Sequence, residues 1–260
     1  MPNWITNNVE ITARQKVIDQ IRHDCFDEND NFYFSGICPI PNGLLNVQAP
    51  PNFPAIAIAV KHMSEEEKEN VFNHISDKFK QTISNMSDEL EQKLEADFAE
   101  WVKKDFVVEQ YDYLGKGIDT LEKLGKQYLD NYFNTGCLEW YDWCLKNWGT
   151  KWNPDDTYLD KCNGGILKMT ICTAWSSPMA FFEKLVNKYD IHSINVKYAD
   201  ENVGYNCGEY AFSKEEGYTQ WNPEEGSDEA VKFACEILGY DESEFIDEND
   251  ELLGRVLYGI

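Results

Sequence analysis

Basic side chains are scarce in this sequence. Its 260 residues include 23 Lys and Arg against 47 Asp and Glu, so the formal net charge is −24. A protein that holds DNA or RNA by its phosphates needs a basic surface, and the shortage therefore argues against direct nucleic-acid binding. For the same reason, an anionic membrane surface is not an expected partner.

Long apolar runs are missing too. The longest, residues 55–60, is far shorter than the roughly 20 residues that cross a bilayer. The first residues have neither the basic start nor the apolar stretch of a signal peptide. Without a sign of export, the eight cysteines are expected to be reduced thiols, and the predicted location is the cytoplasm.

Motifs for catalysis, metals and phosphates are lacking as well. The cysteines form no C-x-x-C pair, and neither Gly115-Lys-Gly117 nor Gly164-Gly165 has the spacing of a phosphate-binding loop. The histidines have no metal-binding spacing and lie in no nucleophile motif: His23, His62, His74 and His192. We therefore predict a protein that is not an enzyme and has no metal or cofactor. An enzyme site assembled from scattered residues is the open alternative.

Hydrophobic residues make up 42% of the chain and aromatic residues 14%, which is enough for a packed core. Alternation with a period of two predicts strands, and spacing of three and four predicts helices. The expected strands are 8–13, 31–38, 166–173, 192–199, 206–213 and 218–221, and the expected helices are 14–23, 138–148 and one opening at Pro178. This order predicts an α+β fold with a ferredoxin-like split β-α-β core.

The middle of the chain has a different pattern. Residues 46–60 contain three prolines and are expected to be an irregular connection. Ser64 and Glu67 form a capping box, after which an apolar stripe runs from Phe72 to Trp101. The stripe is interrupted near Gly115 and resumes over residues 118–132. We expect a long helical insertion, whose 64–135 helices could also join two copies of the chain.

Acidic residues are concentrated at the C-terminal end. Residues 223–260 contain 12 acidic and 2 basic side chains, a net charge of −10, and still carry apolar positions at helical spacing. This predicts a folded acidic extension. The expected domains are a core of residues 1–43 and 136–222, a helical insertion at 44–135, and the acidic extension at 223–260.

Two parts of the sequence resemble a known family. They are the opening Pro2-Asn3-Trp4-x-x-Asn7 with Phe34-x-x-Ile37-x-Pro39-x-Pro41, and the run from Trp140 to Trp152 with Thr173-Ala-Trp175-Ser-x-Pro178. Together they resemble the YubB-like ferredoxin-like family of phage and plasmid proteins, over residues 1–41 and 137–222. The resemblance implies a ferredoxin-like core and a mobile-element origin. It implies no catalytic residue, because the family is largely uncharacterised.

The string Asn147-Trp-Gly-Thr-Lys-Trp152 allows two interpretations. Trp148 and Trp152 could form an exposed stacking platform with Lys151 above it. Alternatively, the string is a helix end capped by Gly149, with the tryptophans filling the edge of the core. We favour the second interpretation.

The charge excess suggests how the protein works. Carboxylates gathered on one face could occupy a basic nucleic-acid groove on another protein and give fast, salt-sensitive binding. The function hypothesis is a phage or plasmid accessory protein that blocks a host nuclease or RNA-guided defence complex. A self-assembling scaffold protein is the alternative. The candidate binding residues are Asp155, Asp156, Asp200, Glu201, Glu215, Glu216, Glu224, Glu225, Asp241, Glu242, Glu244, Asp247, Glu248, Asp250 and Glu251.

Overall fold

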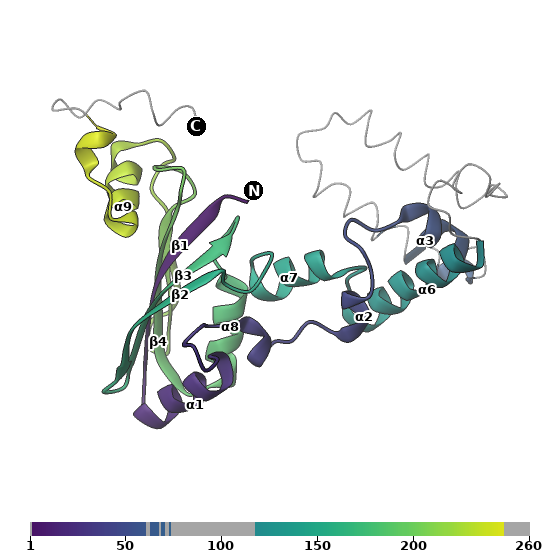
Figure 1. Ribbon diagram of the computed structural model, residues 1–260, viewed down its shortest axis with the longest axis horizontal. Coiled ribbons are helices and arrows are strands. Elements are labelled where there is room, and N and C mark those ends of the chain that lie inside the picture. Colours follow the sequence, from purple (N-terminus) through teal and green to yellow (C-terminus); the bar gives the residue numbers. More distant parts are fainter. Residues whose placement is uncertain (1, 61–62, 68, 71–72, 74–117, 247–260) are drawn as a thin grey trace. The chain divides into compact units, whose positions relative to one another are not determined.

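The computed structural model divides the chain into two compact units (Figure 1). The sheet unit comprises residues 1–39 and 144–260, and the helical unit comprises residues 40–143. The structure describes residues 2–60, 63–67, 69–70, 73 and 118–246. The stripe from Phe72 to Trp101, the break near Gly115 and the four acidic positions Asp247, Glu248, Asp250 and Glu251 lie outside the described residues, apart from Asn73 within the stripe.

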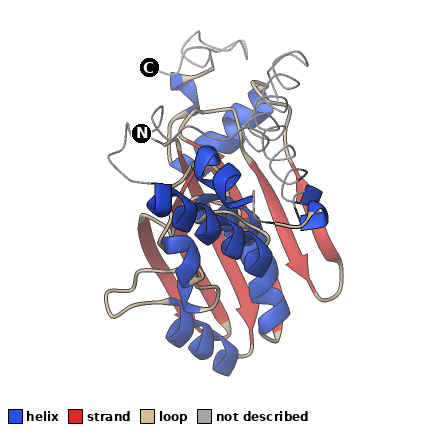
Figure 2. Cartoon of the chain, turned by 90° about the vertical axis from the view of Figure 1, so that its right-hand side faces the viewer, coloured by secondary structure: helices blue, strands red, loops and turns tan. Residues whose placement is uncertain are grey.

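The sheet unit has a ferredoxin-like core, as predicted. Its strand order is β2-β3-β1-β4-β5-β6, and all neighbouring strands are antiparallel (Figure 2). The first four strands in chain order, with helices after β1 and β3, make the split β-α-β arrangement. The elements are β1 (Trp4–Ala13), α1 (Gln15–Cys25), β2 (Asp156–Asn163), β3 (Ile166–Ala174), α8 (Met179–Lys188), β4 (Ile191–Asp200), β5 (Gly208–Ser213) and β6 (Gly217–Trp221).

One face of the sheet is buried beneath α1 and α8, which lie on the same side of it (Figure 1). Alternate residues of β1, including Ile5, Val9 and Ile11, point to that face and are buried. The helices bury the stripes that their spacing predicts, among them Ile18 of α1 and Phe182 of α8. The period of the apolar pattern therefore determines both the elements and the face that they share.

The strand predicted at residues 31–38 is wrong. Phe32 forms only a bridge with Phe26, and residues 34–36 form a short 3₁₀ helix, η1 (Phe34–Gly36). The Phe34 ring packs 4.5 Å from that of Phe181, and its backbone N–H donates to Asn153 Oδ1 at 2.7 Å. The aromatic side chains are thus buried without a strand ladder. The second core strand is β2, so the insertion lies between α1 and β2.

The helical unit contains α2 (Asn42–Leu45), α3 (Phe53–Val60) and α6 (Ile118–Thr135), and α7 (Trp140–Trp148) begins in it. The irregular connection predicted at 46–60 is wrong in its second half, because α3 forms there. Ile56 and Val60 of α3 share a buried cluster with Tyr128 of α6. The capping box is confirmed: Glu67 Oε2 accepts from Ser64 N at 2.9 Å, and Glu67 N donates to Ser64 Oγ at 3.3 Å.

The described part of the acidic extension is folded. It forms α9 (Asp228–Leu238) and the 3₁₀ helix η4 (Glu242–Glu244), on the side of the sheet opposite α1 and α8 (Figure 1). Ser227 Oγ accepts from Ala230 N at 3.1 Å and begins α9, and Gly239 ends it in the left-handed conformation. A buried cluster that includes Ala199, Val203 and Ala234 fixes α9 to the sheet unit. None of the described helices combines the length and apolarity that a bilayer-spanning helix requires.

The eight cysteines are all free thiols. Burial raises the pKa of Cys25 to about 12 and that of Cys207 to about 11. Because the thiolate is the reactive form, iodoacetamide at pH 8 should modify these two residues at least about a hundredfold more slowly in the folded protein than in urea. Peptide mapping over time measures both rates. Rapid modification of either thiol in the folded protein would contradict the buried positions.

Candidate functional site

One end of the sheet unit, where β3 and β4 finish and β1 begins, gathers polar groups from distant segments. Asn7 is fully buried there, and its Nδ2 lies 3.0 Å from Ile5 O, 3.2 Å from Ile171 O and 2.9 Å from Thr173 Oγ1. Thr173 in turn donates to Ser176 O at 2.8 Å. The carboxamide oxygen of Asn7 has no partner among the described residues. These bonds fix the turn that follows β3.

Trp175 occupies that turn in an unusual conformation. Its φ is 70°, a region that side-chain-bearing residues seldom adopt because of the steric cost. Its N–H donates to Asn3 O at 2.9 Å, and Asn206 Nδ2 donates to its carbonyl at 3.3 Å. The indole is nevertheless 47% exposed. The surrounding bonds therefore hold a large aromatic side chain at the surface on a strained backbone.

The C-terminal end of α7 is joined to the same turn. Gly149 ends α7 with a φ of 84°, and its carbonyl accepts from Ser176 Oγ at 2.5 Å. Thr150 Oγ1 donates to Ala174 O at 2.7 Å. The helix-end interpretation of the tryptophan string therefore matches the structure at Gly149.

The three-residue aromatic platform is not formed. Trp148 is buried, and its Nε1 donates to Cys38 O at 2.9 Å, so its ring offers no exposed surface for stacking. Lys151 lies 4.1 Å above the ring of Trp152, which is 40% exposed. Of the proposed platform, only the pair Lys151 and Trp152 lies at the surface.

Fourteen of the fifteen predicted acidic residues, all except Asp200, fall into three groups. The first group is exposed, either at the end of the sheet that carries Trp175 and α9 or on the segments next to α9. We call its eight residues the acidic end: Asp155, Asp156, Glu201, Glu224, Glu225, Asp241, Glu242 and Glu244. Glu215 and Glu216 lie at the tip of the β5–β6 hairpin, at the opposite end. The last four positions lie outside the described residues.

The prediction that Asp200 belongs to the binding surface is wrong. Its side chain is only 5% exposed. It accepts from Asn3 Nδ2 at 3.2 Å, from the Asn202 backbone N–H at 2.8 Å and from Asn206 Nδ2 at 3.2 Å. The carboxylate of Asp200 therefore fixes the polar groups beneath the acidic end and is not offered to a partner.

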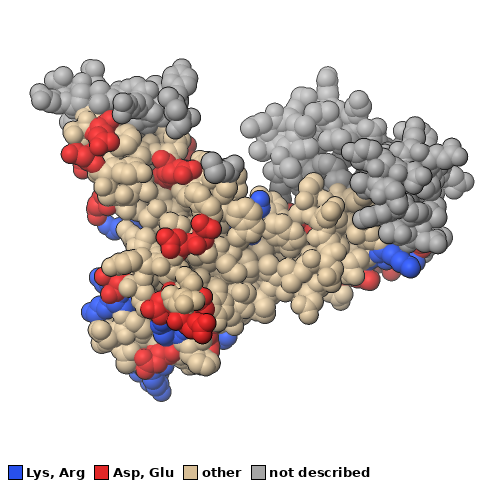
Figure 3. Space-filling view, viewed as in Figure 1, with Lys and Arg blue, Asp and Glu red and all other residues tan. Residues whose placement is uncertain are grey.

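The segment that carries α9 has few cations of its own, although Lys197 of β4 lies 3.6 Å from Glu236 of that helix. Residues 223–246 contain eight acidic side chains and one basic one, Lys232. Figure 3 shows red side chains over the part of the sheet unit that carries α9, with red and blue mixed towards the other end of the strands. On the face that Figure 3 shows, the negative charge of the described sheet unit is thus unevenly distributed.

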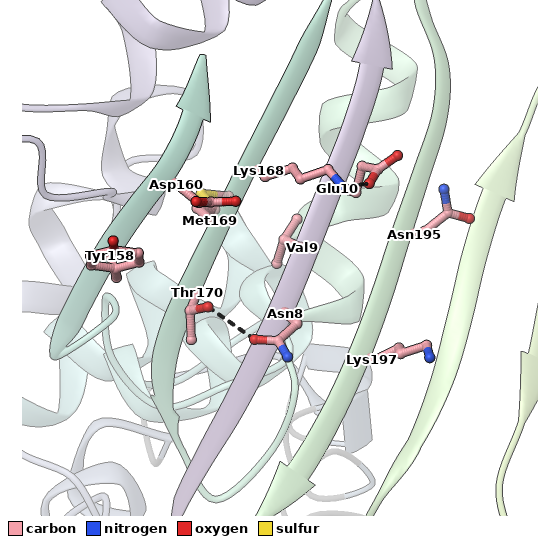
Figure 4. Close-up of a pocket in the computed structure, with 10 residues that line it drawn as sticks. All are labelled: Asn8, Val9, Glu10, Tyr158, Asp160, Lys168, Met169, Thr170, Asn195 and Lys197. Atoms are coloured by element: carbon pink, nitrogen blue, oxygen red, sulfur yellow. Dashed lines mark hydrogen bonds and ion pairs between the residues drawn. The ribbon is translucent and has the colours of Figure 1, made fainter. Parts of the chain in front are cut away.

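The sheet face that α9 leaves open is chemically mixed (Figure 4). It forms a shallow hollow of about 530 Å³ lined by β1, β2, β3 and β4. Lys168 Nζ lies 2.6 Å from Glu10 Oε2, and this hydrogen bond raises the pKa of Lys168. Thr170 Oγ1 donates to Asn8 Oδ1 at 2.9 Å. Lys197 of this face pairs in turn with Glu236 of α9 at 3.6 Å, so three of the four charged side chains have an opposite charge beside them. This makes the face a weaker binding surface than the acidic end.

A metal site is not seen among the described residues. Within residues 2–60 and 118–246, no three His, Cys, Asp or Glu side chains are placed to hold a metal ion. A second hollow, of about 490 Å³, lies between α8 and the β5–β6 hairpin. Sequence reasoning missed it, although Phe212 and Tyr218, which lie directly opposite each other on two adjacent strands, indicated an aromatic face there.

Comparison with known proteins bears on the fold. Residues 147–244 match a family model described as "Ferredoxin-like domain in Api92-like protein". This region is similar to the Api92-like ferredoxin-like domain. The match supports the predicted ferredoxin-like fold, and its description says nothing of a YubB-like family or of a phage or plasmid origin. It extends to residue 244, so α9 and η4 lie within the matched region.

Among solved structures, the chain is similar to the crystal structure of a protein Api92 from Yersinia pseudotuberculosis. The two share 13% sequence identity with a TM-score of 0.40, over 86% of this chain and 99% of the other. No curated protein matches the chain.

Proposed function

We propose that this chain is a binding protein whose acidic end occupies a basic surface on a second protein. The observation that carries the proposal is the excess of carboxylates on residues 223–246, which contain eight acidic side chains against one basic one and are folded onto the sheet. Carboxylates on a rigid support need little ordering when a partner binds, unlike those of a solvated tail. Their mutual repulsion is relieved by a cationic surface, which favours fast association at low salt.

A basic surface that binds carboxylates in this way is typical of proteins that handle nucleic acids. We therefore propose that the partner is a nuclease or an RNA-guided complex and that binding blocks its groove. The wider setting, an anti-defence protein of a phage or plasmid acting in the host cytoplasm, is proposed from the sequence resemblance alone. The scaffold alternative depends on helices at 64–135, most of which lie outside the described residues.

Neutralising four exposed carboxylates of the acidic end should weaken partner binding about tenfold, because each rim charge contributes a few tenths of a kcal/mol or more. The test variant carries Glu224→Gln, Glu225→Gln, Glu242→Gln and Glu244→Gln. The measurement is quantitative capture of partners from a bacterial lysate at low and high salt, followed by the Kd of the purified partner.

The matched control loses four exposed carboxylates far from the acidic end in sequence. It carries Asp19→Asn, Glu28→Gln, Glu66→Gln and Asp130→Asn. The control should retain the partner, and raising the salt should release it from the unmodified protein. Equal loss in both variants would show that only net charge matters. Failure to retain any specific protein at low salt would overturn the proposal.

A further inference from the structure

The two edges of the sheet differ in how they are protected. Edge strands expose unpaired backbone groups, and proteins usually block them with charges, prolines or bulges. The β2 edge carries Asp156, Asp160 and Lys161, and its register shifts at Leu159. β6 is the edge strand on the other side, and all five of its residues, Gly-Tyr-Thr-Gln-Trp, are exposed. Its sequence contains no charge and no proline, so this edge lacks the usual protection.

A groove runs beside the unprotected edge. The ferredoxin-like core ends at β4, and the β5–β6 hairpin extends the sheet past that strand. The resulting hollow of about 490 Å³ lies between Met179 and Val186 of α8 and Phe212 and Tyr218 of the hairpin. Tyr218 is 48% exposed, and its ring lies 5.2 Å from that of Phe212. An apolar side chain of an added strand would find aromatic surface there.

The other face of β6 is also aromatic. The ring of Trp221 lies 5.2 Å from that of Phe233 on α9, and the indole is 38% exposed. Side chains of a strand point alternately to the two faces of the sheet. A segment paired with β6 would therefore contact Tyr218 with one set of side chains and Trp221 with the other.

The charges around β6 determine what can bind. Glu183 lines the groove, Glu209 is paired with Trp221, and Glu215, Glu216, Glu224 and Glu225 flank the strand in sequence. The nearest lysine in sequence, Lys214, is bonded to Asp190, and Lys197, which lies opposite Glu209 on β4, pairs with Glu236 of α9. A second copy of this chain would bring the same carboxylates against these, so charge disfavours a β6–β6 dimer. Charge favours an extended segment that carries lysine or arginine.

We propose that β6 is a docking edge that takes up an extended, lysine- or arginine-bearing segment of the partner protein as a seventh strand. Main-chain hydrogen bonds to β6 hold the segment, its apolar side chains enter the groove beside Tyr218, and its basic side chains contact the flanking glutamates. The inference rests on the proposed basic partner, but it names a binding mode that contact with the acidic end alone does not require.

The probe is a short, blocked and fluorescently labelled peptide of alternating lysine and valine, used below the concentration at which it self-associates. It should bind at least about tenfold more tightly than its glutamate–valine counterpart. N-methylation of its central amides preserves the charge and removes the donors, and should weaken binding by at least about tenfold. Hydrogen exchange should slow in residues 217–221 and not in β2.

Tyr218→Ala should weaken peptide binding, while Tyr158→Ala, which truncates an exposed tyrosine on the opposite edge strand, should not. Equal binding of the N-methylated peptide would overturn strand addition and leave the acidic-end proposal standing.

The variants separate the two binding surfaces. If the peptide no longer binds the four-glutamine variant but still binds Tyr218→Ala, the contact lies at the acidic end and the docking edge is overturned. No peptide binding, or a dimer by light scattering that protects 217–221, would also overturn it. Peptide binding as expected, with no partner retained from lysate, would overturn only the proposed function.

Discussion

Replacing Gly125 with alanine is expected to destabilise the helical unit by about 2–3 kcal/mol, although the same change inside most helices stabilises by about 1 kcal/mol. A Cβ at Gly125 in α6 would lie 2.0 Å from Ala55 O and 2.9 Å from Ala59 Cβ, both on α3. The first of these atoms belongs to the backbone and has no rotamer to change. The two helices must therefore move apart, which opens the buried cluster between them.

Hydrogen exchange measured by mass spectrometry can assign the loss to one unit. Gly125→Ala should accelerate exchange in α3 and α6 and leave β1, β3 and β4 unchanged. Lys123→Ala, at an exposed position of the same helix, serves as the control for helix propensity and should change stability by less than about 0.5 kcal/mol. Equal or slower exchange in α3 after Gly125→Ala would show that the helices are not in close contact.

The sequence predicts those elements whose apolar pattern has one clear period. β1, α1, α8 and β4 each bury one face, and their positions are confirmed to within a few residues. β2 was missed because none of its residues is fully buried, so it leaves no apolar alternation. The pattern at 31–38 was misleading, since aromatic side chains there enter the core from a 3₁₀ helix and its flanks.

α3 shows a second kind of failure. Pro50, Pro51 and Pro54 argued for an irregular connection, but Pro54 lies in the first turn of α3, where no backbone N–H is needed. The sequence alone does not show whether a proline lies in the first turn of a helix, because the start of the helix must be known first. The role of Gly125 is hidden in the same way, because only the approach of α3 requires a residue without a Cβ.

Composition indicated the acidic surface, but tertiary contacts decide which carboxylates form it. Asp200 and Glu201 are neighbours in sequence, yet only Asp200 is buried, because Asn3 and Asn206 come together around it. In the same way, β6 was predicted as a strand, but its position at an edge depends on the strand order. No local pattern in the sequence contains that order.

Asn7→Ala is expected to lower the free energy of unfolding by about 2–4 kcal/mol, because it removes a buried donor shared by two carbonyls and the Thr173 hydroxyl. The effect should reach Trp175, since Thr173 also bonds to the carbonyl of Ser176 in the same turn. Urea denaturation gives the loss of stability. Hydrogen exchange in residues 173–178 should become faster before the rest of the sheet unfolds.

Asn8→Ala is the matched control, because Asn8 follows Asn7 in the same strand and points to the opposite, exposed face (Figure 4). It loses one surface hydrogen bond with Thr170, so the expected loss of stability is below about 1 kcal/mol. If Asn7→Ala and Asn8→Ala lowered the free energy of unfolding equally, the buried hydrogen bonds of Asn7 would not be what fixes the turn after β3. If Asn7→Ala destabilised the sheet but left exchange at 173–178 unchanged, Trp175 would be held in its strained conformation by Asn3 and Asn206 alone.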